Sequence, residues 1–147
     1  MTADGSITFA AVPPNRVETI WPLAKPHLKR AAMVTNGVFS IDDIERSVFG
    51  KEVILWVVMQ GGVVIAALTT RVMQYPSRKA LAIDWVGGSK IKEWMGDCHS
   101  MLVDFAKKSE CSHLEGYGVR AWGRLLSDRG WKQAYITYRM ELQDERR

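Results

Sequence analysis

The fold is decided by the stretch Lys79-Ala-Leu-Ala-Ile-Asp-Trp-Val-Gly-Gly-Ser-Lys90 and the run that follows it, Ile91-Lys-Glu-Trp-Met-Gly-Asp-Cys-His-Ser-Met-Leu-Val-Asp-Phe-Ala-Lys-Lys108. The first part predicts a strand, because it is a short apolar run closed by two glycines. The second part predicts a helix, because its apolar residues recur every three or four positions. Ser89 stands where a helix N-cap is expected.

This junction of strand, glycines and helix is a candidate anion site. The first turn of a helix has backbone N–H groups without intrahelical partners, and the helix dipole adds to their attraction for a phosphate. Gly-Gly-Ser-Lys is neither a P-loop nor a G-x-G-x-x-G fingerprint, and most such junctions are connections alone. The residues therefore leave both interpretations open.

Composition favours one globular domain over residues 1–147, because a chain of this length can bury a core without metals or disulfides. A net charge of +4 is compatible with an anionic ligand but too weak to indicate nucleic acid.

The two cysteines are expected to be buried thiols in a reducing compartment, and no histidine pair has metal-ligand spacing. No signal peptide or membrane-length apolar run is visible, so we expect a cytoplasmic protein.

The apolar pattern of the whole chain predicts an α/β fold of the mixed α+β kind, in which helices flank a mixed sheet. We expect a central mixed sheet of about six strands, flanked by about four helices, with an antiparallel front half. The expected strands are 7–12, 52–59, 63–72, 80–86, 112–117 and 131–142. The expected helices run from residue 16 to about residue 34 with a kink at two prolines, from 41 to 49, from 91 onward, and from 120 to about 127.

This order of elements resembles the GNAT superfamily of N-acetyltransferases over essentially the whole chain. The unit from Val86 to Trp94 stands in the place of that family's acetyl-CoA-binding segment, and Gly130-Trp131 resembles its closing Gly-aromatic pair. The combination of Leu55-Trp56, the Trp85-Val-Gly-Gly turn, Phe105-Ala-Lys, Cys111 to Glu115 and Gly130-Trp-Lys also resembles short GNAT-like proteins of tailed bacteriophages.

The resemblance implies acetyl-CoA as cosubstrate. In the family, the strand before the glycine turn pairs with the pantetheine arm and the following amides hold the pyrophosphate. Carried over, the arm would lie along Asp84, Trp85 and Val86. The pyrophosphate would lie at Gly87, Gly88, Ser89, Lys90 and Ile91, where the two glycines permit close approach and the lysine adds charge.

Two positions depart from the family pattern. The usual pyrophosphate signature is longer, with an Arg or Gln before spaced glycines, and here it is shortened to Gly-Gly-Ser-Lys. The family often has a general-acid tyrosine four residues before the Gly-aromatic pair, and Leu126 occupies that position here. A leucine has no proton to donate to a leaving thiolate.

Acetyl transfer to an amine also needs a proton acceptor, for which Asp84 and Glu115 are the candidates. They lie on successive strands, so they could flank a cleft if those strands are neighbours. The alternative is that each pairs with a nearby cation, such as Lys79 or Arg120. Thr69-Thr70 could line a substrate groove, although ordinary strand alternation explains them equally well.

Two functions follow from these observations. The first is an acetyl-CoA-dependent N-acyltransferase acting on an amine of a small molecule or a protein. The second is a GNAT-fold protein without catalysis that binds another protein, such as a host or virion protein if the chain is phage-encoded. We expect no nucleic-acid or membrane partner, and a homodimer is compatible with either function.

Overall fold

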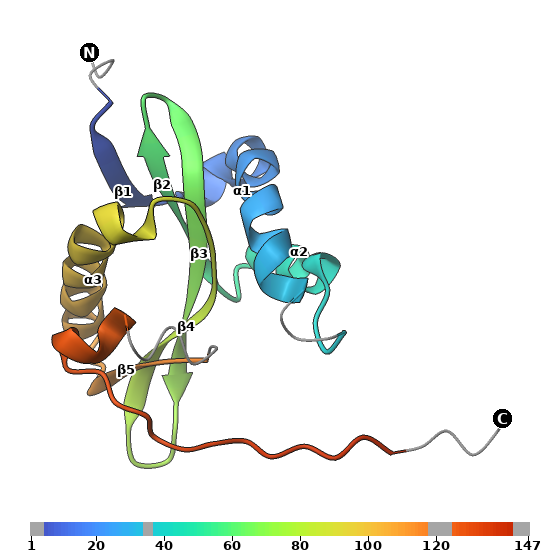
Figure 1. Ribbon diagram of the computed structural model, residues 1–147, viewed down its shortest axis with the longest axis vertical. Helices are drawn as coiled ribbons and strands as arrows, with labels where there is room; N and C mark the ends of the chain where they lie inside the picture. Colours follow the sequence, from blue (N-terminus) through green and yellow to red (C-terminus); the bar gives the residue numbers. More distant parts are fainter. Residues whose placement is uncertain (1–4, 34–36, 118–124, 143–147) are drawn as a thin grey trace, which may run out of the picture. The chain divides into compact units, whose positions relative to one another are not determined.

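The computed structural model describes residues 5–33, 37–117 and 125–142 (Figure 1). Two compact units divide the chain, Met1–Gly116 and Tyr117–Arg147. The first contains a five-stranded sheet in the order β1-β2-β3-β4-β5. All neighbouring strands are antiparallel except β4 and β5, which are parallel. The strands are β1 (Ile7–Ala11), β2 (Ile54–Gln60), β3 (Val63–Gln74), β4 (Lys79–Gly88) and β5 (His113–Gly116).

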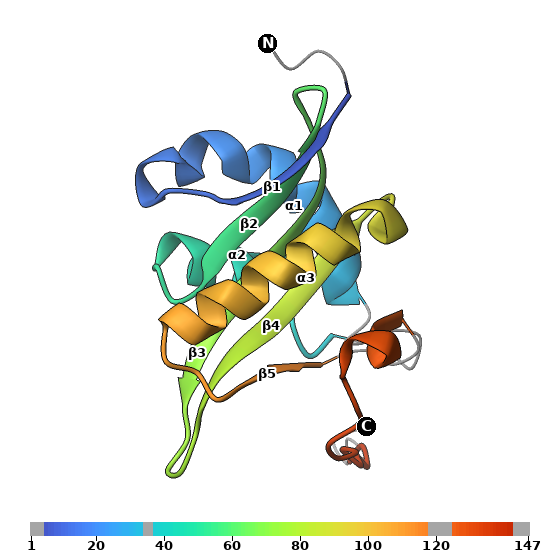
Figure 2. The ribbon, with the colours of Figure 1, turned by 90° about the vertical axis from the view of Figure 1, so that its left-hand side faces the viewer.

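Three α-helices of the described chain cover the two faces of this sheet. The helices α1 (Val17–Met33) and α2 (Ile41–Phe49) lie on one face, and α3 (Ile91–Lys108) lies across the other (Figures 1 and 2). A short 3-10 turn, η1 (Pro14–Arg16), leads into α1. This arrangement confirms the predicted mixed α+β class and the antiparallel front half, with five strands in the sheet.

The helices α1 and α2 differ in their local sequence features: α1 contains two prolines, and α2 begins with a side-chain cap. Pro22 and Pro26 both lie inside α1, which the structure assigns as one α-helix from Val17 to Met33. Both prolines are exposed, on the side where solvent can satisfy the carbonyls that they leave unpaired. Ser40 caps α2 as predicted, in a capping box completed by Asp43, and Gly50 follows its last turn.

The core has one layer on each face of the sheet. On the α1/α2 face, Leu28 and Ile44 pack against β2 and β3 with little or no exposed surface. On the α3 face, Trp56 stacks on Phe9 with ring centroids 5.1 Å apart and meets Phe105 edge-on at 5.5 Å. Covering both faces explains why the two central strands are apolar almost without alternation.

The second unit contains the 3-10 turn η2 (Ser127–Arg129), which ends at Gly130 in the left-handed conformation. The expected helix 120–127 falls largely outside the described residues. The expected strand 131–142, which we call the C-terminal segment, forms no strand in the described chain. That prediction was wrong, because alternation of apolar and polar residues shows only that a segment suits a sheet, and a strand also needs hydrogen-bonded pairing with another strand.

A search of the described residues for a helix both long enough and apolar enough to cross a membrane finds none.

Candidate functional site

The strand β4 loses one of its two neighbours halfway along its length. It pairs with β3 from Lys79 to Gly88, but its parallel pairing with β5 covers only Ala80 to Ile83. We call residues 79–83 the paired half of β4 and residues 84–88 its open half. In the described chain, the open half has no strand on its β5 side, so alternate N–H and C=O groups point away from β3 without a ladder partner there.

A β-bulge marks the point where the open half begins. Thr69 of β3 is paired with Trp85, while the next residue, Thr70, is paired with Ile83, so Asp84 is the extra residue on β4. A bulge disrupts the ladder, bends the strand and re-aims a side chain. The bulge therefore explains why the pairing of β4 with β5 ends at this place. The alternation of residues in the sequence gave no sign of the bulge.

The carboxylate of Asp84 is held by Arg71 of β3. Two guanidinium nitrogens, Nε and Nη2, donate to the two carboxylate oxygens at 2.9 and 3.0 Å. The Asp84 side chain is only 11% exposed, so this two-point contact satisfies a largely buried charge. The sequence-based alternative of a cation partner is thus correct for Asp84, and the partner that the structure shows is Arg71 rather than Lys79. Arg120, the other predicted partner, lies outside the described residues.

The second carboxylate, Glu115, lies on β5 opposite Ala82 of β4. The strands that carry the two candidates are therefore neighbours, as expected. Glu115 accepts hydrogen bonds from the Tyr75 hydroxyl and from Nε2 of His113, the latter at 3.0 Å. The Tyr75 and His113 rings stack with centroids 6.5 Å apart, so a small polar network surrounds this carboxylate.

Sequence reasoning missed Arg71 and Tyr75 as partners of these carboxylates. Tyr75 is in the β3–β4 connection, 40 positions from Glu115 in the chain, and Arg71 is 13 positions from Asp84. The predicted hairpin of β3 and β4 was the only signal that could have pointed to Arg71, because antiparallel pairing places Arg71 opposite Ala82, two residues before Asp84. The exact pairing depends on the bulge, which the sequence did not reveal.

The pair Thr69 and Thr70 does not line a groove. Both residues are completely buried, and the Thr70 hydroxyl accepts a 2.8 Å hydrogen bond from Nε1 of Trp56. The interpretation as substrate-facing residues is therefore wrong, and ordinary core packing accounts for them. Trp85, opposite Thr69, instead meets Phe39 edge-on with centroids 5.1 Å apart, which brings the connection between α1 and α2 next to the open half.

Gly87 and Gly88 belong to the end of β4 rather than to a turn. A Cβ on Gly87 would lie 2.1 Å from the backbone oxygen of His27 in α1. A Cβ on Gly88, whose φ is +136°, would lie 2.4 Å from Cα of Ala66. These glycines therefore admit the protein's own backbone on the sides where a Cβ would point, which is a different reason for glycine from the approach of a phosphate.

The start of α3 also differs from the expected N-cap. Lys90, not Ser89, is the N-cap, in the left-handed conformation and without a side-chain cap. The Ser89 amide donates to the Ile65 carbonyl at 3.0 Å, and its carbonyl accepts from Nε1 of Trp94 at 2.8 Å. These contacts fix the chain where it leaves β4, and they use the Ser89 amide within the protein.

The side chain of Lys90 also has a partner within the chain, since its Nζ lies 2.7 Å from Oε1 of Gln60. The amides of Ile91 and Lys92 are the first two of the helix, where no preceding turn offers an i−4 carbonyl. They are the donors that remain available to an anion at this helix end.

Neither cysteine has the setting of a nucleophile. Cys98 is buried in α3, and this burial raises the pKa of its thiol to about 12. Cys111 is a free, half-buried thiol just before β5. In the part of the chain that the structure describes, no three His, Cys, Asp or Glu side chains are grouped as metal ligands would be.

No protein-family model matches the sequence, and no curated protein matches it either. Solved structures do match in fold. A ribosomal-protein-alanine N-acetyltransferase from Brucella melitensis biovar Abortus 2308 aligns with 94% of this chain and 100% of its own, with a TM-score of 0.65 and 14% identity. A predicted acetyltransferase with acetyl-CoA from Clostridium acetobutylicum aligns with 92% of this chain and 96% of its own, at 0.62 and 8%.

A third similar structure is an aminoglycoside acetyltransferase from an uncultured soil metagenomic sample, in complex with sisomicin. It aligns with 93% of this chain and 97% of its own, with a TM-score of 0.63 and 11% identity. Identities this low establish the architecture and leave the chemistry to the residues of the site. The chain has the fold of the GNAT acetyltransferases.

Proposed function

We propose that this protein is an acetyl-CoA-dependent N-acyltransferase that acts on an amine of a small molecule or a protein. The observation that carries the proposal is the open half of β4, which begins at a bulge and leads directly into the start of α3. It offers a row of backbone groups followed by free helix amides. A long polar chain that ends in a pyrophosphate matches both features.

The cosubstrate fits this edge in two respects. Its amide-containing arm would add to the open half as an extra strand does, with main-chain hydrogen bonds to residues 84–88. Its phosphates would accept from the amides of Ile91 and Lys92, with the positive end of the α3 dipole behind them. This fit does not depend on space left open by Gly87 and Gly88. The positions where their Cβ atoms would lie are already occupied by atoms of His27 and Ala66.

Acetyl-CoA, when bound, supplies an acetyl thioester. The chain's own part is to orient it, polarise its carbonyl and accept a proton from the amine. Main-chain N–H groups beside the bulge are rigid donors for the carbonyl. The permanent charge of Arg71 neutralises Asp84, whereas Glu115 accepts from a hydroxyl and an imidazole, so we assign proton acceptance to Glu115 and a positioning role to Asp84.

A calorimetric titration with acetyl-CoA tests the proposal. We expect saturable binding, and a roughly tenfold weaker affinity for Lys92→Glu, which places a negative charge beside the phosphates. Glutamate in the first turn of a helix favours folding, so this variant should remain stable. The matched control is Lys108→Glu, which makes the same charge change on an exposed residue at the opposite end of α3.

Release of free thiol in the presence of a panel of amines then measures turnover. Glu115→Gln should bind acetyl-CoA as the wild type does and lose most of its activity, by a factor on the order of a hundred or more. No binding of acetyl-CoA at millimolar concentration would remove the acyltransferase proposal.

A second function is favoured by specific features of the site. Leu126 replaces the usual acid, Asp84 is neutralised by Arg71, and the Lys90 ammonium contacts Gln60. These are the features of a GNAT-fold protein that binds a partner without catalysis, such as a host or virion protein if the chain is phage-encoded. Acetyl-CoA binding with no thiol release for any amine would favour this second function.

A further inference from the structure

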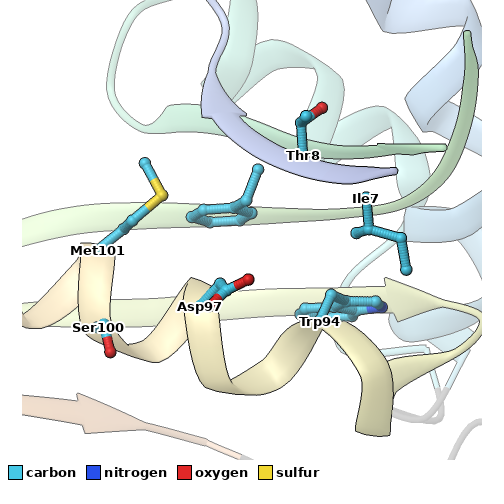
Figure 3. Close-up of a pocket in the computed structure, with 7 residues that line it drawn as sticks. Ile7, Thr8, Trp94, Asp97, Ser100 and Met101 are labelled. Carbon is cyan, nitrogen blue, oxygen red and sulfur yellow. The ribbon is translucent and has the colours of Figure 1, made fainter. Parts of the chain in front are cut away.

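Side chains that exchange protons are gathered on β5 rather than in the groove between β1 and α3. That groove has a volume of about 420 Å³ and is lined by apolar side chains of both elements, together with a few polar ones (Figure 3). Among the described residues that line it, Asp97 is the only titratable side chain. On β5, by contrast, a histidine and a carboxylate are joined by a hydrogen bond, His113 to Glu115.

The two oxygens of the Glu115 carboxylate accept hydrogen bonds from different donors. Oε1 accepts from Nε2 of His113 at 3.0 Å, and Oε2 accepts from the Tyr75 hydroxyl. The rings of these two donors are stacked, with an interplanar angle of 15°, so each ring also restrains the other. Donors on both oxygens fix the plane of the carboxylate, which is what a positioned proton acceptor requires.

A further hydrogen bond completes the setting of His113. An ionised carboxylate only accepts, so the hydrogen of the neutral ring is on Nε2 and Nδ1 keeps a lone pair. Oγ of Ser112 lies 3.3 Å from Nδ1 and accepts from Nε of Arg78 at 3.2 Å, so its own hydrogen serves as a donor. The Lys79 carbonyl is also 3.3 Å from Oγ, but it already accepts from the Ser112 amide at 2.7 Å. The hydroxyl hydrogen is therefore assigned to Nδ1.

This network lies on the same face of the sheet as the ion pair at the bulge. Arg71, Ala82 and Glu115 are opposite one another on β3, β4 and β5. Opposite residues point to the same side of a sheet, so Glu115 shares a face with the guanidinium that holds Asp84. Ala82 between them has only a methyl group. The carboxylate is thus one strand away from the start of the open half, where the acetyl end of a cosubstrate with its phosphates at α3 would lie.

We propose that Ser112, His113 and Tyr75 are positioning residues for Glu115, a role that rests on the proposed acyltransferase function. Ser112 holds Nδ1 of His113, and the Nε2–H of His113 and the Tyr75 hydroxyl orient the carboxylate. In the transfer, a neutral amine forms the C–N bond and loses one N–H proton to Glu115. The C–S bond breaks, and the thiolate takes a proton from water. His113 keeps its own proton throughout, so it acts through Glu115.

Nitrogen-15 NMR of the histidine rings tests the network in the free protein, at about pH 8, where histidines are generally neutral. We expect His113 in the Nε2–H form, with its signals assigned by their absence from His113→Gln. Ser112→Ala should move the Nδ1 signal and leave the tautomer unchanged. Ser112 is exposed, so this variant should remain folded. An Nδ1–H form in the wild type, or an Nδ1 signal that Ser112→Ala leaves in place, would overturn the proposal.

Steady-state acetyl transfer with two substitutions of His113 tests the role. Glutamine keeps an N–H donor that can reach Glu115, and leucine does not. We expect His113→Leu to lower kcat by about tenfold or more at an unchanged Kd for acetyl-CoA, because a misplaced group costs rate rather than binding. His113→Gln should recover most of the loss. Equal activity of the two variants would show that the ring has a packing role alone, and would overturn the proposal.

Tyr75→Phe keeps the stacked ring and removes the second donor, so it should lower kcat as His113→Leu does. The matched control is Asp97→Asn, which removes a carboxylate in the groove between β1 and α3 and should leave kcat unchanged. Full activity of Tyr75→Phe would contradict the role given to its hydroxyl. A wild type that shows the expected NMR signals but transfers acetyl to no amine would instead refute the proposed function, with the network itself confirmed.

Discussion

The two halves of β4 belong to one strand, but they have different surroundings. The paired half lies between β3 and β5, and Ala80, Leu81 and Ala82 have no exposed surface. Among the described strands, the open half pairs with β3 alone, and its residues are half-buried or exposed. The bulge at Asp84 separates them. One strand thus provides a rigid anchor at one end and an accessible backbone at the other, which is what a binding site built on a sheet requires.

The largest effect on stability is expected where the open half meets α1. Gly87→Ala would place a Cβ 2.1 Å from the backbone oxygen of His27, and backbone cannot rotate away as a side chain can. We expect a loss of at least about 3 kcal/mol in the free energy of unfolding, measured by urea denaturation. Ser89→Ala is the control, with a loss below about 1 kcal/mol. Wild-type stability of Gly87→Ala would show that α1 is not so close to β4.

Truncation of an apolar side chain in each half compares their packing directly. Leu81 is fully buried in the paired half, so Leu81→Ala should lower the free energy of unfolding by about 3 kcal/mol. Val86 is half-buried in the open half, and Val86→Ala should cost about 1 kcal/mol. Equal losses for the two variants would mean that both halves are packed alike, contrary to the structure.

The ion pair at the bulge should contribute less than the core residues. Arg71→Ala removes the partner of a largely buried carboxylate and should destabilise the protein by about 1–2 kcal/mol. A double-mutant cycle with Asp84→Ala should show a coupling energy of about 1 kcal/mol that decreases in high salt. Strictly additive losses would indicate that the two side chains do not interact in solution.

The smallest effect lies outside β4 and depends on pH. Hydrogen bonds from Ser40 at the start of α2 lower the pKa of Asp43 below its ordinary value, and Arg46 adds to this. A lowered pKa in the folded state stabilises the protein above the unfolded-state pKa, and this stabilisation is lost as pH falls through the folded-state pKa. Urea denaturation between about pH 6 and about pH 3 should therefore show less acid sensitivity in Asp43→Asn than in the wild type.

Much of the architecture could be predicted from the sequence, because local signals determine it. Ser40 and Asp43 indicate the start of α2. Gly61-Gly62 indicates the turn between β2 and β3, and the apolar periodicity after residue 90 predicts α3. Each of these elements depends on residues close together in the chain. The GNAT-like order of strands and helices follows from them.

The details of the site could not be predicted, because they depend on residues far apart in the chain. The bulge at Asp84 is a property of the register between β3 and β4, and the role of Gly87 depends on α1, some 60 residues earlier. The absent strand at 131–142 has the same cause, since strand formation needs a partner edge as well as a suitable sequence.

The most direct test of the account is backbone hydrogen exchange of β4 with and without acetyl-CoA. In the free protein, we expect slow exchange at residues 80–82 and faster exchange at alternate amides of the open half. Saturating acetyl-CoA should slow the open half and the amides of Ile91 and Lys92 by at least about tenfold, and leave the paired half unchanged. Binding without protection of the open half, or no binding at all, would contradict the account.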